Sequence, residues 1–359
     1  MAERARATIA TIAREAGVSV PTVSKVLNNR GDVAPQTRRR VEDLLVKHRY
    51  RRRTATRTTR TGLIDLVFVD LHGQWSAEVL RGVEEATQRA DVGVVVSAVK
   101  GQEARPHGHW LRRIMARGSD GLLLVLSDLS PDQRSQLADV GMPVVLVDPV
   151  GVPDAEIASV GATNWRGGMA ATQHLIELGH SRIAVIGGPP AYLCSRARLD
   201  GYRSALERAG LTVPAEYVRQ GDFLSASGHR ETMALLDLDE PPTAIFACAD
   251  QMAMGVYEAL FDRGLRVPQD VSVVGFDDLA QTRWAVPPLT TVRQPLTEMA
   301  AVATRMLLQL VAGEELDSTR LELTTDLVRR SSTAPPGAAA PPEPAAGEAA
   351  EEPGAPVGA

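Results

Sequence analysis

The first 50 residues show apolar side chains at helical spacing in three short stretches. In the first stretch, apolar residues recur three and four positions apart, at Ile9, Ile12, Ala13 and Ala16. The second stretch follows Ser19, a favourable N-cap residue, and the third begins at Pro35. This pattern predicts three short helices.

From Leu63 onward the pattern changes to short apolar runs, such as residues 63–71 and 144–149, separated by stretches of helical periodicity. Continuous apolar runs that are too short for ordinary helices are typical of parallel strands buried on both faces. The chain is therefore predicted to be α/β, with parallel sheets after a helical head. Several runs end in Asp, Ser or Gly, and ligands of such sheets bind outside the carboxyl ends of the strands.

After Arg330 the sequence is dominated by Ala, Pro, Gly and Glu. Such a composition cannot build a packed core. Residues 331–359 are therefore predicted to form a disordered tail.

The net charge of -5 hides a strong asymmetry along the chain. Residues 1–60 contain fifteen Lys/Arg and five Asp/Glu, a net charge of +10, so the rest of the chain carries -15. A small basic head on an acidic body indicates a module that binds a polyanion, joined to a domain with another task.

Several other functions find no support in the sequence. "VIGGPP" has a glycine pair after a strand but lacks a full nucleotide-binding motif, and no GxSxG is present. His107 and His109 have no further ligands at metal-binding spacing. We expect no enzymatic activity, no cofactor and no metal.

The sequence also bears on the compartment. The N-terminus has no apolar signal segment, and no apolar run approaches the roughly 20 residues of a membrane span. Cys194 and Cys248 form no CxxC motif, which fits reduced thiols. We therefore expect a cytoplasmic protein with no membrane partner.

The stretch "EAGVSVPTVSKVLN" has the layout of a helix-turn-helix. Gly17 permits a tight reversal, Val18 can fill the joint, and the second helix presents its first residues outward. A three-helix interaction module could share this layout but would not need ten excess positive charges. The head is therefore predicted to bind DNA.

A family resemblance now adds to this reading. The head resembles the LacI/GalR family of bacterial transcription factors in "TIATIAREAGVSVPTVSKVLNN" and "VAPQTRRRVEDLL", and the body resembles it in "NWRGGMAATQHLIELGHSRIAVIGG", "TAIFACADQMAMG", "GLRVPQDVSVVGFDD" and "PPLTTVRQP". The resemblance covers roughly residues 8–330. It implies a homodimer in which a helix-turn-helix head is joined to a two-lobed, periplasmic-binding-protein-like body.

The resemblance also implies domain boundaries. We expect a DNA-binding head at 1–50, a basic linker at 51–61 and an effector-binding and dimerisation body at 62–330. Within the body, lobe 1 is expected at about 62–161 and 292–325, and lobe 2 at about 162–291.

Carried over by position, the base-reading residues of the head would be Val20, Pro21 and Lys25. Lys25 can donate to guanine, while Val20 and Pro21 offer only apolar contact, for example with a thymine methyl group. In the alternative interpretation Val20 and Pro21 merely shape the start of the helix. The residues suited to phosphate contacts are Ser19, Thr22, Ser24 and Asn28.

The resemblance likewise places a set of side chains near the cleft between the lobes. These are Asp70, Trp75, Ser76, Ser127, Asp148, Arg198, Phe223, Asp277 and Gln294. Each has an alternative structural role, since Trp75 could be a core residue, Asp148 and Asp277 could cap helices, and Arg198 could form an ion pair.

The chemistry of this set favours a polyhydroxylated effector. Carboxylates accept hydrogen bonds from hydroxyl groups, arginine donates in a rigid fork, and aromatic rings cover the apolar face of a sugar. A sugar or small oligosaccharide is therefore expected, with a purine as the alternative. Cys194 and Ala249 stand where some family members carry hydrogen-bonding side chains, which leaves the effector's identity open.

The linker "HRYRRRTATRTTRTG" departs from the family pattern. Family members typically have a turn and a hinge helix that inserts a leucine into the minor groove. Here Arg52 and Arg53 stand at the turn and Thr59 near the leucine. With Arg51 and Arg57, they predict an arginine-rich arm that lies along DNA and kinks it weakly.

Taken together, these patterns favour a transcriptional regulator, most often a repressor in this family, that binds a palindromic operator as a homodimer. A sugar-binding protein of a transport system would need a signal segment and no basic head, and a sugar-processing enzyme would need a catalytic constellation.

Overall fold

The computed structural model describes residues 9–27, 33–48, 60–71, 73–99, 109–127, 129–151, 154 and 156–337. They fall into two compact units, a helical head and an α/β body that begins at Arg60. No helix within the described part of the chain is long and apolar enough to cross a membrane.

The head has the three predicted helices, α1 (Ile9–Ala16), α2 (Val20–Leu27) and α3 (Pro35–Lys47). They enclose a small core that includes Ile12, Val23 and Val41, all fully buried. Gly17 has a φ of 66°, which ends α1, and the Thr22 backbone N–H donates to the Ser19 side-chain oxygen at 3.3 Å. Ser19 is thus the N-cap of α2, as its position before the apolar pattern predicts.

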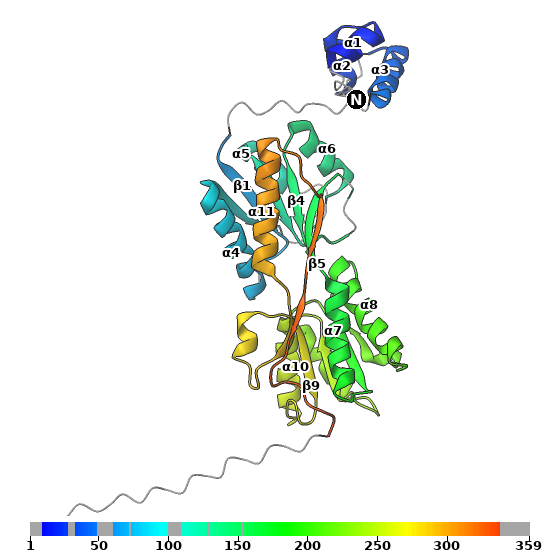
Figure 1. The fold of residues 1–359 in the computed structure, drawn as a ribbon, viewed down its shortest axis with the longest axis vertical. Coiled ribbons are helices and arrows are strands. Elements are labelled where there is room, and N and C mark those ends of the chain that lie inside the picture. Colours follow the sequence, from blue (N-terminus) through cyan, green and yellow to red (C-terminus); the bar gives the residue numbers. More distant parts are fainter. Residues whose placement is uncertain are drawn as a thin grey trace, which may run out of the picture. The chain divides into compact units, whose positions relative to one another are not determined.

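Lobe 1 of the body is built on a parallel six-stranded sheet of order β11-β5-β4-β3-β1-β2 (Figure 1). Its strands are β1 (Leu63–Phe68), β2 (Gly93–Ala98), β3 (Gly121–Val125), β4 (Val144–Val147), β5 (Ala158–Ala162) and β11 (Arg320–Leu323). The connecting helices are α4 (Gly73–Ala90), α5 (Trp110–Arg117), α6 (Pro131–Val140) and α11 (Leu296–Ala312). Strands β1, β3 and β4 are almost entirely buried, which explains their continuous apolar sequences.

Lobe 2 has a second six-stranded sheet, of order β12-β10-β9-β8-β6-β7, in which only β12 is antiparallel to its neighbour. Its strands are β6 (Ile183–Gly187), β7 (Val218–Gln220), β8 (Ala244–Ala247), β9 (Ser272–Asp277), β10 (Thr290–Arg293) and β12 (Asp326–Val328). Its helices are α7 (Asn164–Glu177), α8 (Leu193–Arg208), η2 (Ala215–Tyr217), α9 (Ser225–Leu236), α10 (Asp250–Asp262) and η3 (Ala280–Arg283).

The chain crosses between the two lobes three times, after β5, after β10 and after β11 (Figure 1). The predicted α/β class with two parallel sheets is confirmed. The second lobe 1 segment follows Arg293, because β10 continues to that residue in the sheet of lobe 2. The return to lobe 2 through β12 was not anticipated, since a three-residue strand has no distinctive pattern.

The predicted disorder from residue 331 onward is wrong for residues 331–337, which pack on lobe 2. Ser332 is fully buried; its hydroxyl donates to the Val273 carbonyl at 2.6 Å and accepts from the Thr290 N–H at 2.7 Å. These hydrogen bonds attach residues 331–337 to lobe 2, although this segment has too few apolar side chains to form a core of its own. Residues 338–359 of the predicted tail lie outside the described residues.

Candidate functional site

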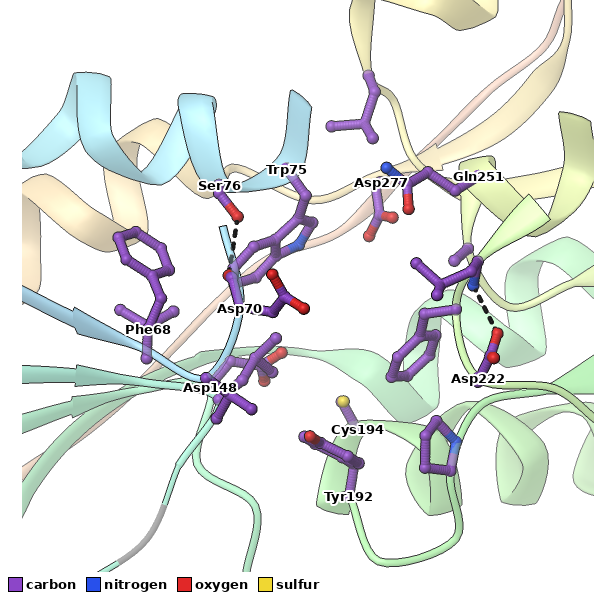
Figure 2. Close-up of a pocket in the computed structure, with 18 of the residues that line it drawn as sticks. Phe68, Asp70, Trp75, Ser76, Asp148, Tyr192, Cys194, Asp222, Gln251 and Asp277 are labelled. Atoms are coloured by element: carbon purple, nitrogen blue, oxygen red, sulfur yellow. Dashed lines mark hydrogen bonds between the residues drawn. The ribbon is translucent and has the colours of Figure 1, made fainter. Parts of the chain in front are cut away.

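A cavity of about 210 Å³ lies between the two lobes, at the carboxyl ends of strands from both sheets (Figure 2). From lobe 1 it is lined by Phe68, Val69, Asp70, Trp75, Ser76, Val125, Leu126 and Asp148. From lobe 2 it is lined by Pro189, Tyr192, Cys194, Arg198, Asp222, Phe223, Leu224, Ala249, Gln251, Asp277 and Leu279. This location is the one where parallel α/β sheets bind ligands.

Seven of the nine effector residues suggested by the sequence line this cavity. They are Asp70, Trp75, Ser76, Asp148, Arg198, Phe223 and Asp277. Ser127 and Gln294 do not line the cavity. Gln294 instead accepts a hydrogen bond from Arg198. Trp284, the residue after η3, is 74% exposed and does not line the cavity.

Sequence reasoning missed several lining residues, chiefly Tyr192, Asp222 and Gln251. Asp222 lies two residues after β7 (Val218–Gln220), so the rule that ligands bind beyond the carboxyl ends of parallel strands could have pointed to it. Tyr192 and Gln251 lie in or beside the first turn of a helix, where no sequence pattern separates a lining residue from an exposed one.

Arg198 on α8 is the most firmly held polar group of the site. Its side chain is 4% exposed, and its Nε donates to Asn164 Oδ1 at 2.8 Å. The two terminal nitrogens donate to the Cys248 carbonyl at 2.7 Å and to Gln294 Oε1 at 2.8 Å. Of the five N–H donors of an arginine, one on each terminal nitrogen is left for a ligand.

The guanidinium of Arg198 also stacks on Phe276, with its carbon 3.7 Å from the ring centroid. The ring of Phe223 lies on the cavity side at 5.8 Å. Stacking and three directed hydrogen bonds together fix the plane of the guanidinium before any ligand arrives.

Two buried carboxylates face Arg198. Asp277 Oδ1 lies 3.9 Å from Arg198 Nη1 and has no hydrogen-bond partner among the described residues. Burial raises the pKa of Asp277 to about 7, opposed by Arg198 and reinforced by the negative charge of Asp148. Burial likewise raises the pKa of Asp148, against the attraction of Arg198. The unpaired oxygen of Asp277 can therefore accept a hydrogen bond from a ligand.

The backbone around the cavity is strained. Six non-glycine residues in the described ranges have positive φ, and four of them line the cavity: Leu126, Asp148, Phe223 and Asp277. Such conformations are costly for these residue types, and they gather at functional sites, where the surrounding structure enforces them. The strain supports assigning function to this cavity.

Aromatic side chains give the cavity apolar surfaces beside its polar groups. Tyr192 and Phe223 meet edge to face, with centroids 6.0 Å apart and planes at 72°. Trp75 approaches from α4 on the opposite lobe (Figure 2). Carboxylates, a fixed guanidinium and non-parallel aromatic faces can hold a small molecule that is rich in hydroxyl groups.

Both cysteines are free and buried, and burial raises the pKa of each thiol. Cys194 lines the cavity, where its protonated sulfur is a weak hydrogen-bonding group. Within the described ranges, His, Cys, Asp and Glu side chains form no group of three or more suited to a metal ion.

In the head, α2 exposes the side chains that the sequence assigned to base contacts. Val20, Pro21 and Lys25 are exposed, whereas Val23 and Val26 on the opposite face are buried. Ser19 is exposed, and Thr22 and Ser24 are half-buried. The structure thus leaves the expected reading face of α2 accessible to a partner.

Part of the expected DNA-binding set lies outside the described residues, namely Asn28, Arg51, Arg52, Arg53, Arg57 and Thr59. Arg60, the first linker residue that the structure describes, donates to the Val311 carbonyl at 3.1 Å. The backbone N–H groups of Thr61 and Gly62 both donate to Asp120, at 3.0 and 2.8 Å. The last two residues of the expected linker are therefore attached to lobe 1.

Comparisons with known proteins agree with this architecture. A family model described as "Bacterial regulatory proteins, lacI family" matches residues 8–53, and "Periplasmic binding protein-like domain" matches 172–333. The ribose operon repressor of Escherichia coli (strain K12) is 34% identical over 330 residues, which are 91% of this chain and 99% of that protein.

Solved structures of regulators are similar along the same length. A complex of the transcriptional regulator CelR with cellobiose has 34% identity and a TM-score of 0.69, covering 91% of this chain and all of the other. The lac repressor dimer bound to operator and an anti-inducer has 28% identity and a TM-score of 0.66, covering 92% and 100% of the two chains. These similar proteins are transcriptional regulators rather than enzymes.

Proposed function

Because the chain belongs to the LacI family of bacterial regulatory proteins, we propose that it is a transcriptional repressor controlled by a small polyhydroxylated effector. The effector binds in the cavity between the lobes and sets the affinity of the head for operator DNA. As a repressor of chromosomal operators, the protein acts in the cytoplasm.

The arrangement of Arg198, Asp277 and Asp148 is the observation that supports this effector class best. A vicinal pair of hydroxyl groups can accept from the two remaining guanidinium N–H groups and donate to the carboxylates. The cavity of about 210 Å³ is smaller than the roughly 300–1,000 Å³ typical of drug-sized ligands. A monosaccharide such as ribose therefore fits the proposal better than an oligosaccharide.

A purine is the second candidate because aromatic rings line the cavity. A flat base is best held between parallel faces, whereas Tyr192 and Phe223 meet at 72°. One face and one edge suit the puckered ring of a sugar better than a planar heterocycle.

For the head, we propose that α2 enters the major groove. Lys25 donates to guanine, Val20 and Pro21 make apolar base contacts, and Ser19, Thr22, Ser24 and Asn28 contact phosphates. Two heads of a homodimer would read the half-sites of a palindromic operator. The linker residues Arg51, Arg52, Arg53, Arg57 and Thr59 follow the DNA backbone.

This function can be tested with the full-length protein and a palindromic fragment from its own upstream DNA. We expect a gel shift at low salt, and a thermal shift with D-ribose larger than with cellobiose or hypoxanthine, since a ligand of the native state raises its stability. Absence of a gel shift with and without all three compounds would contradict the proposal. A larger response to hypoxanthine would favour the purine reading.

Asp277→Ala is the matched variant for this experiment. It should bind the operator fragment as the wild type does, because Asp277 belongs to the body, but should lose the response to D-ribose. A variant that responds normally would remove Asp277 from the effector site.

A further inference from the structure

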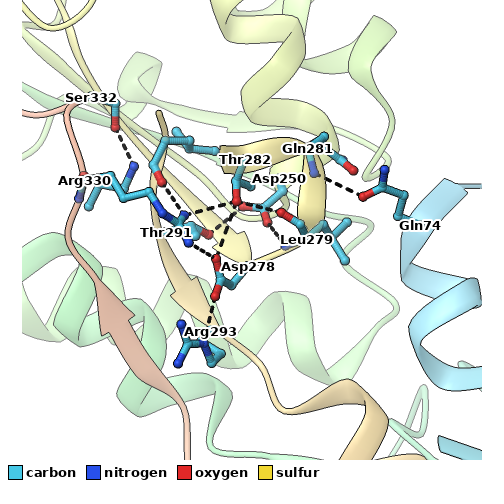
Figure 3. A network of polar contacts seen from close by, with 12 residues as sticks. Gln74, Asp250, Asp278, Leu279, Gln281, Thr282, Thr291, Arg293, Arg330 and Ser332 are labelled. Atoms are coloured by element: carbon cyan, nitrogen blue, oxygen red, sulfur yellow. Dashed lines mark hydrogen bonds and ion pairs between the residues drawn. The ribbon is translucent and has the colours of Figure 1, made fainter. Parts of the chain in front are cut away.

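The residue after Asp277 is held by two arginines that come from different segments of the chain (Figure 3). The side chain of Asp278 is 3% exposed, and it accepts from Arg293 Nε at 2.7 Å. It also forms an ion pair with Arg330. We call Asp278, Arg293 and Arg330 the Asp278 clamp.

The two arginines flank the chain's second excursion into lobe 1. Arg293 is the last residue of β10, immediately before the second crossing, and Arg330 follows β12, after the third crossing. Arg330 is itself fixed, since its guanidinium donates to the Leu289 carbonyl at 2.7 Å and to Thr282 Oγ1 at 3.1 Å. The clamp therefore joins both ends of the excursion to one carboxylate.

That carboxylate sits directly beside the effector site. Asp277 and Asp278 have φ values of 121° and 61°, in the positive region that residues other than glycine seldom occupy. The Gln294 N–H donates to the Asp277 carbonyl at 3.2 Å, and Asp250 accepts from the Leu279 N–H at 2.8 Å. The two charged contacts of Asp278 are the strongest restraints at the centre of this turn.

The same turn touches the opposite lobe. The Gln281 N–H in η3 donates to Gln74 Oε1 at 3.2 Å, and Gln74 precedes Trp75, which lines the cavity from lobe 1 (Figure 3). A shift of the turn would displace Asp277 on one side of the cavity and disturb the contact beside Trp75 on the other.

From these contacts we propose that Asp278 is a positioning residue for the effector site, acting through Asp277. The clamp holds the strained turn so that the Asp277 carboxylate points at Arg198, and it belongs to the response to the effector rather than to operator binding. This inference rests on the proposed function, because it concerns the affinity of the same cavity.

The test is Asp278→Asn in the full-length protein, which removes the charge and keeps the shape. We expect the dissociation constant for D-ribose, measured by calorimetry, to rise at least about tenfold, while operator affinity without sugar stays within about twofold. Arg330→Gln should also weaken D-ribose binding, and the double variant should lose less than the sum of the two single effects, because both variants break the Asp278–Arg330 ion pair.

Asp270→Asn is the matched control. Asp270 also makes an ion pair with Arg266 on lobe 2, Nε to Oδ2 at 3.0 Å, but lies outside the cavity and the clamp. It should leave the affinity for D-ribose unchanged. If Asp278→Asn lowers only the melting temperature while D-ribose binds as to the wild type, the role is merely structural and the inference is overturned.

Two further measurements keep the inference testable. Should Asp278→Asn fail to fold, Arg293→Gln replaces it, because that side chain is 50% exposed and its loss leaves Arg330 on the carboxylate.

Should the wild type bind none of the sugars, the proposed effector class fails by itself. Hydrogen exchange of the free protein then decides: faster exchange at Leu279 and Gln294 in Asp278→Asn is expected, and unchanged exchange overturns the inference.

Discussion

At the scale of single residues, Asp277 combines two opposing effects. Removal from water disfavours its charged form, while Arg198 at 3.9 Å favours it, and the pKa is raised to about 7 as a result. The carboxyl group is thus half ionised near neutral pH. An effector hydroxyl group that donates to Asp277 would find the ionised acceptor more often as the pH rises.

We therefore predict that the affinity for D-ribose increases about tenfold between pH 6 and pH 8, since the ionised fraction of a group with a pKa of about 7 rises by that factor. Calorimetric titrations at the two pH values check this, and Asp277→Asn should give a nearly flat profile. A profile that keeps its slope in Asp277→Asn would assign the titration to Asp148, whose pKa is also raised.

The same pKa has the opposite effect on the stability of the free protein. Because the folded pKa of Asp277 lies above the unfolded value of about 3.9, the native state binds more protons between those values. This contribution to the free energy of unfolding is fully present below pH 4 and is lost as the pH rises to about 7. Effector binding and this part of stability therefore have opposite pH dependences.

Lys25 provides a prediction for the head. Its side chain is exposed on α2, where an ammonium group can donate to guanine O6 and N7. Lys25→Ala should reduce discrimination at one operator position by about 1–3 kcal/mol. Competition titrations with single-base operator variants measure this, and equal weakening on all sequences would show a phosphate contact instead.

At the scale of helices and strands, the proposed effector site depends on how closely α8 approaches α7. A Cβ on Gly201 would lie 2.2 Å from the Trp165 carbonyl oxygen, and one on Gly168 would lie 2.2 Å from the Arg198 carbonyl oxygen. This close approach places Arg198 on α8 against Asn164 at the start of α7. The glycines are thus needed for the hydrogen bond that orients the guanidinium.

We predict that Gly201→Ala lowers both the free energy of unfolding and the affinity for D-ribose. Alanine gains up to about 1 kcal/mol of helix propensity, but overpacking against backbone costs about 1–3 kcal/mol and separates the helices. Chemical denaturation and calorimetry measure the two effects. Gly161→Ala is the control, since a Cβ there meets nothing within 4 Å; it should leave the affinity for D-ribose unchanged and should not lower the free energy of unfolding.

The elements also show which features could be predicted from sequence. The strands and the ends that carry Asp70, Asp148 and Asp277 follow from apolar runs that stop at a carboxylate. The positive φ values of Leu126 and Phe223 could not be predicted, because tertiary packing enforces conformations that their side chains disfavour. The ordered conformation of residues 331–337 could not be predicted either, because it depends on hydrogen bonds to residues distant in the sequence, such as Val273 and Thr290.

At the scale of the whole molecule, the lobes are interleaved rather than consecutive. Three crossing segments join the two sheets, and Gln294 at the second crossing contacts Arg198 directly. Arg198 is thereby linked to the segment that leads into α11. The carboxyl-terminal end of α11 in turn accepts the hydrogen bond from Arg60, the first described residue of the body.

This connection divides the basic linker into two parts with different expected roles. Arg60 is hydrogen-bonded to the body. Arg51, Arg52 and Arg53 follow the head in the sequence, and in our proposal they form a DNA-binding arm. The logarithm of the affinity falls linearly with the logarithm of the salt concentration, and each phosphate contact makes this slope steeper by about 0.9. Replacing the three arginines by Gln should reduce that slope by up to about 3 per arm while preserving base discrimination. Arg60→Gln should leave the slope unchanged, and fluorescence titrations from low to moderate salt compare the variants.

The arm also predicts the shape of the bound operator. Arginine and threonine side chains can follow phosphates or enter a narrow minor groove, but they are not apolar wedges that unstack base pairs. We therefore expect the operator to bend little on binding, with little change in the distance between fluorophores at its two ends. A sharp bend that disappears when Thr59 is changed to Ala would show that the linker inserts at the centre of the operator, and would overturn the arm hypothesis.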